Sequence, residues 1–100
     1  MAKRIRRTSQ ADRDIENLYI YSLKTFGPRQ AESYVARLLS AIDSLSEFPQ
    51  IGVLISRKGR RRRLIHEMHI VYYRVHPDSV EIVRVCDARR DQKRLIKPKD

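Results

Sequence analysis

The spacing of apolar residues changes once along this chain, from a period near 3.6 before Pro49 to a period of 2 after Ile51. The first period predicts amphipathic helices and the second predicts strands, so the two halves form different kinds of element. Helices and strands in separate stretches predict an α+β domain, here a helical hairpin packed on an antiparallel sheet. A length of 100 residues fits one such domain.

Two apolar stripes lie in the first half of the chain, separated by Gly27 and Pro28. Pro28 lacks the N–H that a continuing helix needs, and Gly27 tolerates the backbone conformation that ends one. We therefore predict two helices joined as an αα-hairpin. The stripes consist of Ala11, Ile15, Leu18, Tyr19, Ser22 and Phe26 in the first helix and Ala31, Tyr34, Val35, Leu38, Ile42 and Leu45 in the second.

The outer ends of the two helices also carry signals. Thr8 and Ser9 offer an N-cap for the first helix, and Asp12 is placed to act as the acid of a capping box. Pro49 ends the pattern of the second helix, because proline cannot continue the hydrogen-bond ladder. We expect Phe48 to pack beneath that helix end.

The remaining apolar segments are short and rich in β-branched and aromatic residues, which favour strands. Between Gly52 and Gly59 we expect an irregular or extended stretch, and the last two strands should pair as an antiparallel hairpin. The expected order is β-α-α-β-β-β, in a domain of residues 1–86 followed by a basic tail, residues 87–100. The first strand should join the same sheet, since its backbone groups otherwise lack partners. The strands are predicted at Lys3–Arg7, Arg61–Ile65, Met68–Val75 and Val80–Cys86.

The net charge of +10 is concentrated in the second half of the chain. Residues 1–50 contain 8 basic and 6 acidic residues, whereas residues 51–100 contain 14 and 6. Such asymmetry favours an acidic partner, either nucleic acid or an acidic protein surface. The alternative is that the charge only aids solubility.

Arginines dominate this charge, and their planar fork binds phosphate or carboxylate bidentately. The run Arg60–Arg63 enters a predicted strand, so its second and fourth side chains should lie on one face, and its first and third on the other. Arg74 and Arg84 lie inside apolar strands, where a structural or mixed role is favoured. Arg89 and Arg90 follow the last strand. For each, the alternative is a solvated charge paired with a nearby carboxylate.

Metal and cofactor chemistry find no support in the sequence. His66 and His69 are three residues apart but fall across a predicted turn and strand, and His76 lies in a predicted turn. Together with the single Cys86 they do not form the two ligand pairs of a zinc site, so we expect no metal and no cofactor. No apolar run is long enough for a signal or a membrane span, and the lone cysteine fits the cytoplasm.

Several segments, taken in order over nearly the whole chain, match one family pattern. They are Ala11–Ile15 with Tyr19, Phe26–Ala31 with Tyr34, Phe48–Gly52, His69–Val75, Val80–Val85 and Asp87–Asp91. In order and spacing they resemble the ParE toxins of the ParE/RelE superfamily of bacterial toxin–antitoxin systems. The resemblance implies a RelE/ParE-like fold and a growth-inhibiting toxin, neutralised in a hetero-oligomer by a cognate ParD-like antitoxin with an acidic segment. It also allows indirect DNA association through that antitoxin.

Within the superfamily, ParE-like members are associated with poisoning DNA gyrase, whereas RelE-like members cut messenger RNA on the ribosome. The RelE-like cutters use basic residues on the sheet and a Tyr or His near the C-terminus. No Tyr or His follows Arg89 here, so we expect gyrase inhibition by binding and assign no catalytic residue. His66 or His69 could substitute only if the fold brought one to the site. The alternatives are a ribosome-dependent mRNA interferase and a non-toxic nucleic-acid-binding module.

Two sets of contact residues follow from the resemblance and from the charge pattern. Tyr and Arg are frequent anchors at interfaces, which guides both choices. The residues expected to bind the target and carry toxicity are Arg61, Arg63, Arg74, Arg89 and Arg90. Those expected to bind the antitoxin are Ile15, Tyr19, Tyr34, Arg60 and Arg62.

Overall fold

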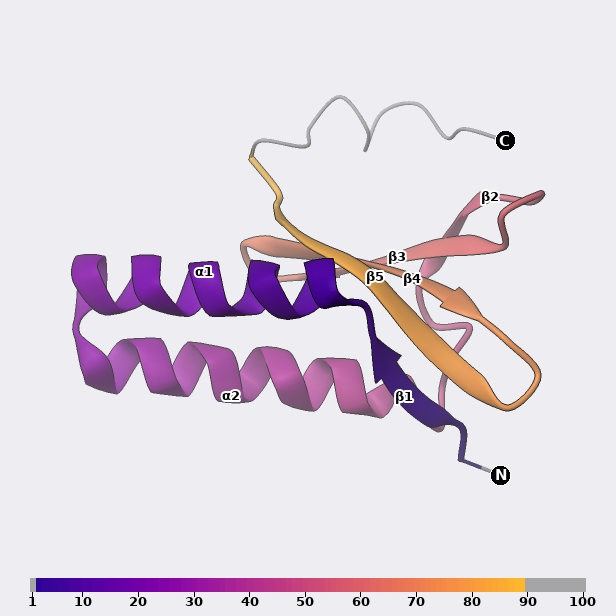
Figure 1. The fold of residues 1–100 in the computed structure, drawn as a ribbon, viewed down its shortest axis with the longest axis horizontal. Coiled ribbons are helices and arrows are strands. Elements are labelled where there is room, and N and C mark those ends of the chain that lie inside the picture. Colours follow the sequence, from indigo (N-terminus) through magenta and orange to yellow (C-terminus); the bar gives the residue numbers. More distant parts are fainter. Residues whose placement is uncertain (1, 90–100) are drawn as a thin grey trace.

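Two helices pack against one face of a five-stranded sheet in the computed structural model, which describes residues 2–89 (Figure 1). The strands follow the order β1-β5-β4-β3-β2 across the sheet. This confirms the predicted α+β class and adds one strand, β2, in the stretch expected to be irregular or extended. The elements are β1 (Arg4–Arg7), α1 (Ser9–Phe26), α2 (Pro28–Ser44), β2 (Val53–Ser56), β3 (Arg61–His66), β4 (His69–Val75) and β5 (Ser79–Asp87).

The sheet is mixed rather than purely antiparallel. Strand β1 pairs in parallel with β5, whereas β5, β4, β3 and β2 pair antiparallel in succession. The antiparallel strands are consecutive in the chain and are joined by short turns, whereas both helices and three strands separate β1 from β5. The predicted β4–β5 hairpin is therefore confirmed, and the antiparallel expectation is wrong for β1 alone. Strand β5 ends at Asp87, one residue beyond the predicted end of the domain.

Helix α1 continues along the edge of β5 where β1 leaves it. The Thr8 hydroxyl accepts the backbone N–H of Ala11 at 3.0 Å and donates to the carbonyl of Val83 at 2.9 Å. Further along, the Asp14 carboxylate accepts the backbone N–H of Val85 at 2.9 Å. Thr8 is therefore the N-cap. The capping box expected for Asp12 does not form, and this carboxylate pairs with the Arg7 guanidinium beside it at 2.7 Å.

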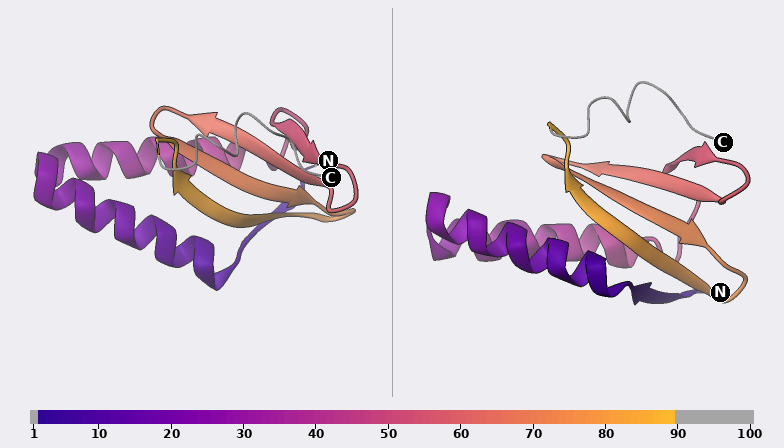
Figure 2. Two further views of the ribbon diagram at one scale, coloured as in Figure 1. Left: turned by 90° about the horizontal axis from the view of Figure 1, so that it is seen from above. Right: turned by 45° about the horizontal axis from the view of Figure 1, so that its top comes forward.

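Gly27 ends α1 with φ +88°, and Pro28 begins α2, as the sequence predicted. The end of the hairpin at Gly27 projects beyond the sheet, which both further views also show (Figure 2). Phe26, expected in the apolar stripe, is 54% exposed because the sheet does not reach this end. Phe48 does not pack beneath α2 either: it is 61% exposed.

The core lies between the hairpin and the nearer face of the sheet. From the sheet, Val71, Tyr73, Val80, Ile82 and Val85 are buried in it. The helical stripes contribute buried residues at the predicted spacing, namely Ala11, Leu18, Ser22, Ala31, Leu38, Ile42 and Leu45. Within residues 2–89, neither helix is long and apolar enough to cross a membrane.

Candidate functional site

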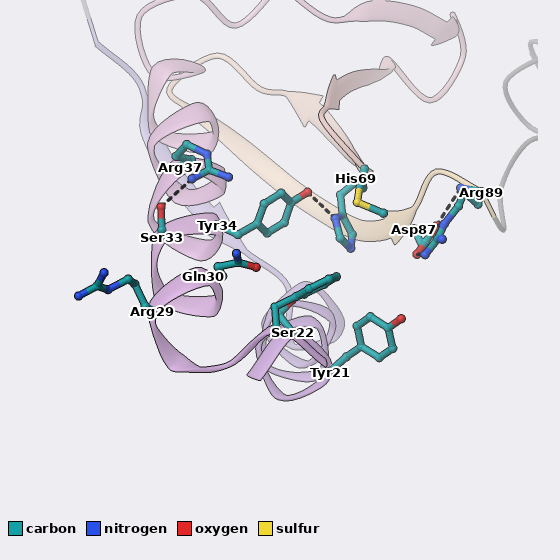
Figure 3. A pocket seen from close by; sticks show the side chains of 12 residues that line it. Tyr21, Ser22, Arg29, Gln30, Ser33, Tyr34, Arg37, His69, Asp87 and Arg89 are labelled. Atoms are coloured by element: carbon teal, nitrogen blue, oxygen red, sulfur yellow. Dashed lines mark hydrogen bonds and ion pairs between the residues drawn. The ribbon is translucent and has the colours of Figure 1, made fainter. Parts of the chain in front are cut away.

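A cavity of about 530 Å³ lies between the projecting end of the helical hairpin, on one side, and the β3–β4 turn and the end of β5, on the other (Figure 3). We call it the helix–sheet pocket. Helices α1 and α2 supply its aromatic walls, and the sheet supplies a histidine, a methionine and an ion pair. Its lining residues are Tyr21, Ser22, Phe26, Arg29, Gln30, Ser33, Tyr34, Arg37, Met68, His69, Asp87 and Arg89.

One wall of this pocket is built from Tyr34 and His69. The Tyr34 hydroxyl lies 2.6 Å from His69 Nδ1, and the ring centroids are 5.4 Å apart. Burial lowers the pKa of His69, so the imidazole is neutral at pH 7. Burial likewise raises the pKa of Tyr34, which keeps the phenol protonated. The wall is therefore polar but uncharged.

Three arginines surround this uncharged wall. Arg37 lies 5.6 Å from the centroid of the Tyr34 ring and pairs with Glu67 at 3.0 Å. The Arg89 guanidinium pairs with Asp87 at 3.1 Å, and this hydrogen bond is the main cause of the lowered Asp87 pKa. Arg29 forms no ion pair with any residue that the structure describes. Aromatic walls with surplus positive charge suit an apolar segment that also carries a carboxylate.

A second feature lies on the sheet face turned away from the helices. Arg6, Glu81, Arg74 and Arg61 are direct cross-strand neighbours on β1, β5, β4 and β3, and we call them the arginine row. Like charges directly opposite each other, as in the Arg61–Arg74 pair, destabilise a sheet. Arg74 Nε is buried and has no hydrogen-bond partner among residues 2–89. A hydrogen bond to His76 at 3.0 Å lowers the pKa of Glu81, which is the single carboxylate in the row.

A third feature, at the opposite end of β4, is a cavity of about 420 Å³ that we call the basic pocket. The basic pocket and the helix–sheet pocket are separated by about 20 Å, the length of β4. The Arg62 guanidinium donates to the carbonyls of Gly52 at 2.7 Å and Gln50 at 3.3 Å. The Lys3 ammonium donates to the carbonyls of Pro77 at 2.7 Å and His76 at 2.9 Å. The lining residues are Lys3, Gln50, Leu54, Arg57, Arg60, Arg62, Val75, His76 and Pro77.

The residues expected to bind an antitoxin do not gather in one place. Tyr34 lines the helix–sheet pocket, while Ile15 is partly buried against the core and Tyr19 is half-buried in α1. Arg60 and Arg62 line the basic pocket instead. Two of the five are thus separated from Tyr34 by the length of β4.

The residues expected to bind the target divide as well. Arg61 and Arg74 are opposite each other, and Arg63 shares their face, because Arg62 between them is opposite the core residue Tyr73. The predicted alternation therefore holds within β3. Arg60 precedes the strand, so the alternation does not extend to it.

Arg84 lies within β5, and Arg89 lies two residues after its end. Arg89 lines the helix–sheet pocket, and Arg90 lies outside the residues that the structure describes. Arg84 forms a 2.8 Å ion pair with Asp14, which joins β5 to α1.

Sequence reasoning assigned no role to several residues of the helix–sheet pocket. Tyr21 lies off the apolar stripe of α1, and an aromatic side chain on the polar side of a helix is a signal that could have identified it. From the sequence, His69 is a candidate as a metal ligand with His66, which the predicted turn and strand argue against, and as a substitute acid–base group. The fold brings it to Arg89 because β4 and β5 pair His69 with Asp87.

The chain matches known proteins over most of its length. A family model described as the ParE toxin of the type II toxin–antitoxin system parDE matches residues 5–92. Toxin ParE1 of Caulobacter vibrioides is 32% identical over 84 residues, covering 83% of this chain and 86% of that protein. Toxin ParE1 of Mycobacterium tuberculosis is 29% identical over 98 residues, covering 96% of this chain and 100% of that protein.

Two solved structures share the fold. The chromosomal ParDE toxin–antitoxin system from P. aeruginosa matches with a TM-score of 0.75 at 20% identity, over 86% of this chain and 96% of that chain. The toxin–antitoxin complex RelBE2 from Mycobacterium tuberculosis matches with a TM-score of 0.65 at 22% identity, over 87% and 99%. At these identities the likeness establishes the architecture and leaves the activity to be argued from the residues.

Proposed function

Because the chain belongs to the ParE toxin family of type II toxin–antitoxin systems, we propose that it inhibits DNA gyrase by binding rather than by hydrolysis. The position of His69 supports binding. Its Nδ1 is occupied by Tyr34, and it lies five residues along β4 from Arg74, about 17 Å. A general acid or base must lie within hydrogen-bond reach of the reacting group, and no Tyr or His follows Arg89.

The arginine row is the surface that we propose for the target. Arg61 and Arg74 are opposite each other, with Arg63 beside them on the same face, and Arg89 and Arg90 follow the sheet. Two facing guanidinium groups repel each other, so an anionic partner gains from neutralising both. We propose that the chain acts in the cytoplasm, because a single cysteine, Cys86, suits a reducing compartment.

We expect the purified chain to reduce DNA supercoiling by gyrase and to accumulate cleaved DNA. The measurement is a supercoiling titration, run beside an assay for cleavage of ribosome-bound messenger RNA. Unchanged supercoiling at a high excess of toxin, together with cleaved messenger RNA, would refute the gyrase proposal.

Ribosome-dependent RNA cleavage is the second candidate, and one observation favours it. His76 Nε2 donates to the Glu81 carboxylate at 3.0 Å, and Glu81 is directly opposite Arg74. This arrangement puts an imidazole and a carboxylate beside an arginine. Replacing His76 by glutamine should leave gyrase inhibition unchanged under our proposal. Loss of an RNA-cleaving activity by roughly 10²- to 10⁴-fold in that variant would instead identify a general acid or base.

A cognate ParD-like antitoxin is the partner that we propose for the helix–sheet pocket. One structural neighbour is a ParDE toxin–antitoxin system and another is a toxin–antitoxin complex. The aromatic walls suit an apolar segment that orders on binding, while Arg29, Arg37 and Arg89 attract its acidic residues. A segment bound there would cover Arg89. Neutralisation then follows from occlusion of a residue proposed for toxicity, in a hetero-oligomer.

Replacing Arg89 and Arg90 together by alanine is expected to abolish growth inhibition while the antitoxin still binds. The aromatic walls of the helix–sheet pocket and the guanidinium groups of Arg29 and Arg37 remain in this variant, so binding of the antitoxin should persist. The measurements are growth at equal protein level and calorimetric titration with the antitoxin. Lys24→Ala, an exposed change on α1, is the control. If the variant still inhibits growth, Arg89 and Arg90 have no role in toxicity and are only surface charges.

A further inference from the structure

The basic pocket concentrates positive charge at one end of the sheet. Lys3, Arg57, Arg60 and Arg62 line it, and no carboxylate is among the described residues of its lining. The helix–sheet pocket differs, because its lining includes the carboxylate of Asp87 and its walls are aromatic. The two cavities therefore suit ligands of different chemistry.

Two of these cations are held in position by the backbone. Lys3 donates to the carbonyls of His76 and Pro77, and Arg62 donates through Nη1 to the carbonyls of Gln50 and Gly52. A guanidinium has five N–H donors, so Arg62 retains donors on its other nitrogens. Because both side chains are already ordered, a ligand that binds them incurs little further loss of side-chain entropy.

Arg60 occupies a backbone conformation that arginine rarely adopts. Its φ is +52°, in the left-handed region where glycine is strongly favoured, and its N–H donates to the Arg57 carbonyl at 3.3 Å to close the β2–β3 turn. A glycine would make this turn with less strain. The arginine at this position therefore strains the backbone of the turn, and its long cationic side chain lines the basic pocket.

We propose that the basic pocket binds a backbone phosphate of DNA, so that this chain contacts DNA directly. Phosphate recognition needs clustered cations and little apolar surface, whereas a bound peptide needs apolar anchors as well. Lys58, between Arg57 and Arg60 in the β2–β3 turn, adds a further exposed cation beside the pocket-lining residues. Several cations in one turn match the repeated charges of a phosphate backbone better than they match a single carboxylate. The contact is independent of gyrase inhibition.

The test is fluorescence anisotropy of a labelled DNA duplex of mixed sequence, with the full chain, between about 50 mM and about 200 mM salt. The variant Arg57→Gln with Arg60→Gly should weaken binding at every salt concentration. Loss of the one phosphate contact made in the pocket should reduce the slope of log affinity against log salt by about 1. The control, Arg13→Gln with Lys24→Gln, removes the same charge from exposed positions on α1 and should keep the wild-type slope.

Folding is checked on the single variant Arg60→Gly, which should melt no lower than the wild type because glycine suits φ +52°. Equal loss of DNA binding in the pocket variant and in the α1 control would overturn the proposal in favour of diffuse charge. Polyglutamate that displaces DNA from the wild type as well as unlabelled duplex does would overturn it in favour of an acidic peptide. Absence of DNA binding by the wild type at the lowest salt would also overturn it.

Discussion

Replacing Gly52 by alanine is expected to destabilise the domain by about 3 to 5 kcal/mol, a large part of the roughly 5–15 kcal/mol that holds a typical small domain folded. A Cβ built at Gly52 would lie 2.5 Å from Tyr73 Oη and 2.6 Å from the Arg63 carbonyl oxygen. Neither atom can move away easily. Tyr73 is fully buried in the core, and the Arg63 carbonyl belongs to the backbone of β3.

The clash also breaks two hydrogen bonds that hold the loop between α2 and β2. The Tyr73 hydroxyl accepts the Gly52 N–H at 2.9 Å and donates to the Pro49 carbonyl at 2.8 Å. Tyr73→Phe removes these bonds without adding bulk, and leaving their partners unsatisfied should cost about 1 to 3 kcal/mol. Urea denaturation followed by circular dichroism measures each change.

Gly59→Ala provides the matched control for the Gly52 variant. Its Cβ would approach the Ser56 hydroxyl at 3.2 Å and nothing closer, so a change within about 1 kcal/mol is expected. Equal unfolding midpoints for the two alanine variants would contradict this prediction. They would show that the loop at Gly52 can move to admit a Cβ and that Tyr73 does not hold it in place.

Replacing Arg61 by glutamate is expected to lower gyrase inhibition by about 100-fold or more while leaving the fold intact. A charge-assisted hydrogen bond contributes about 1.5 to 3 kcal/mol, and the reversed charge adds repulsion toward an anionic target. The stability of the domain should rise slightly in this variant, although its inhibition of gyrase falls. The introduced carboxylate would be directly opposite Arg74, and an opposite-charge pair across two strands stabilises by about 0.2 to 1 kcal/mol relative to alanines.

This opposition of effects makes the Arg61 experiment decisive. Supercoiling titrations and growth assays give the loss of inhibition, and thermal melting gives the stability. Arg13→Glu introduces the same charge change at an exposed position on α1, away from the arginine row, and should keep full inhibition. Full toxicity of the Arg61 variant would exclude the row as a target surface. A lowered melting temperature would show instead that Arg61 serves the fold.

The sequence alone determined the helical hairpin, its turn and the β4–β5 pairing. Helix hydrogen bonds join residues four apart, so the stripes and the Gly27–Pro28 junction contain nearly all the information that the hairpin needs. The alternation within β3 is equally local, because successive side chains of a strand point to opposite faces. Charge and residue type single out the residues expected to bind the antitoxin and the target, but these properties indicate a kind of partner and not a shared surface.

Only the tertiary structure decided which of these residues lie together. The hydrogen bond between Tyr34 and His69 joins residues 35 positions apart, and the arginine row joins β1 to β3 across four strands. Parallel pairing of β1 with β5 likewise has no local signal. Strand partners and cavities arise from contacts between segments far apart in the chain, and the same local pattern is compatible with several pairings. For that reason Arg60 and Arg62 line the basic pocket together with Lys3, which lies near the other end of the chain.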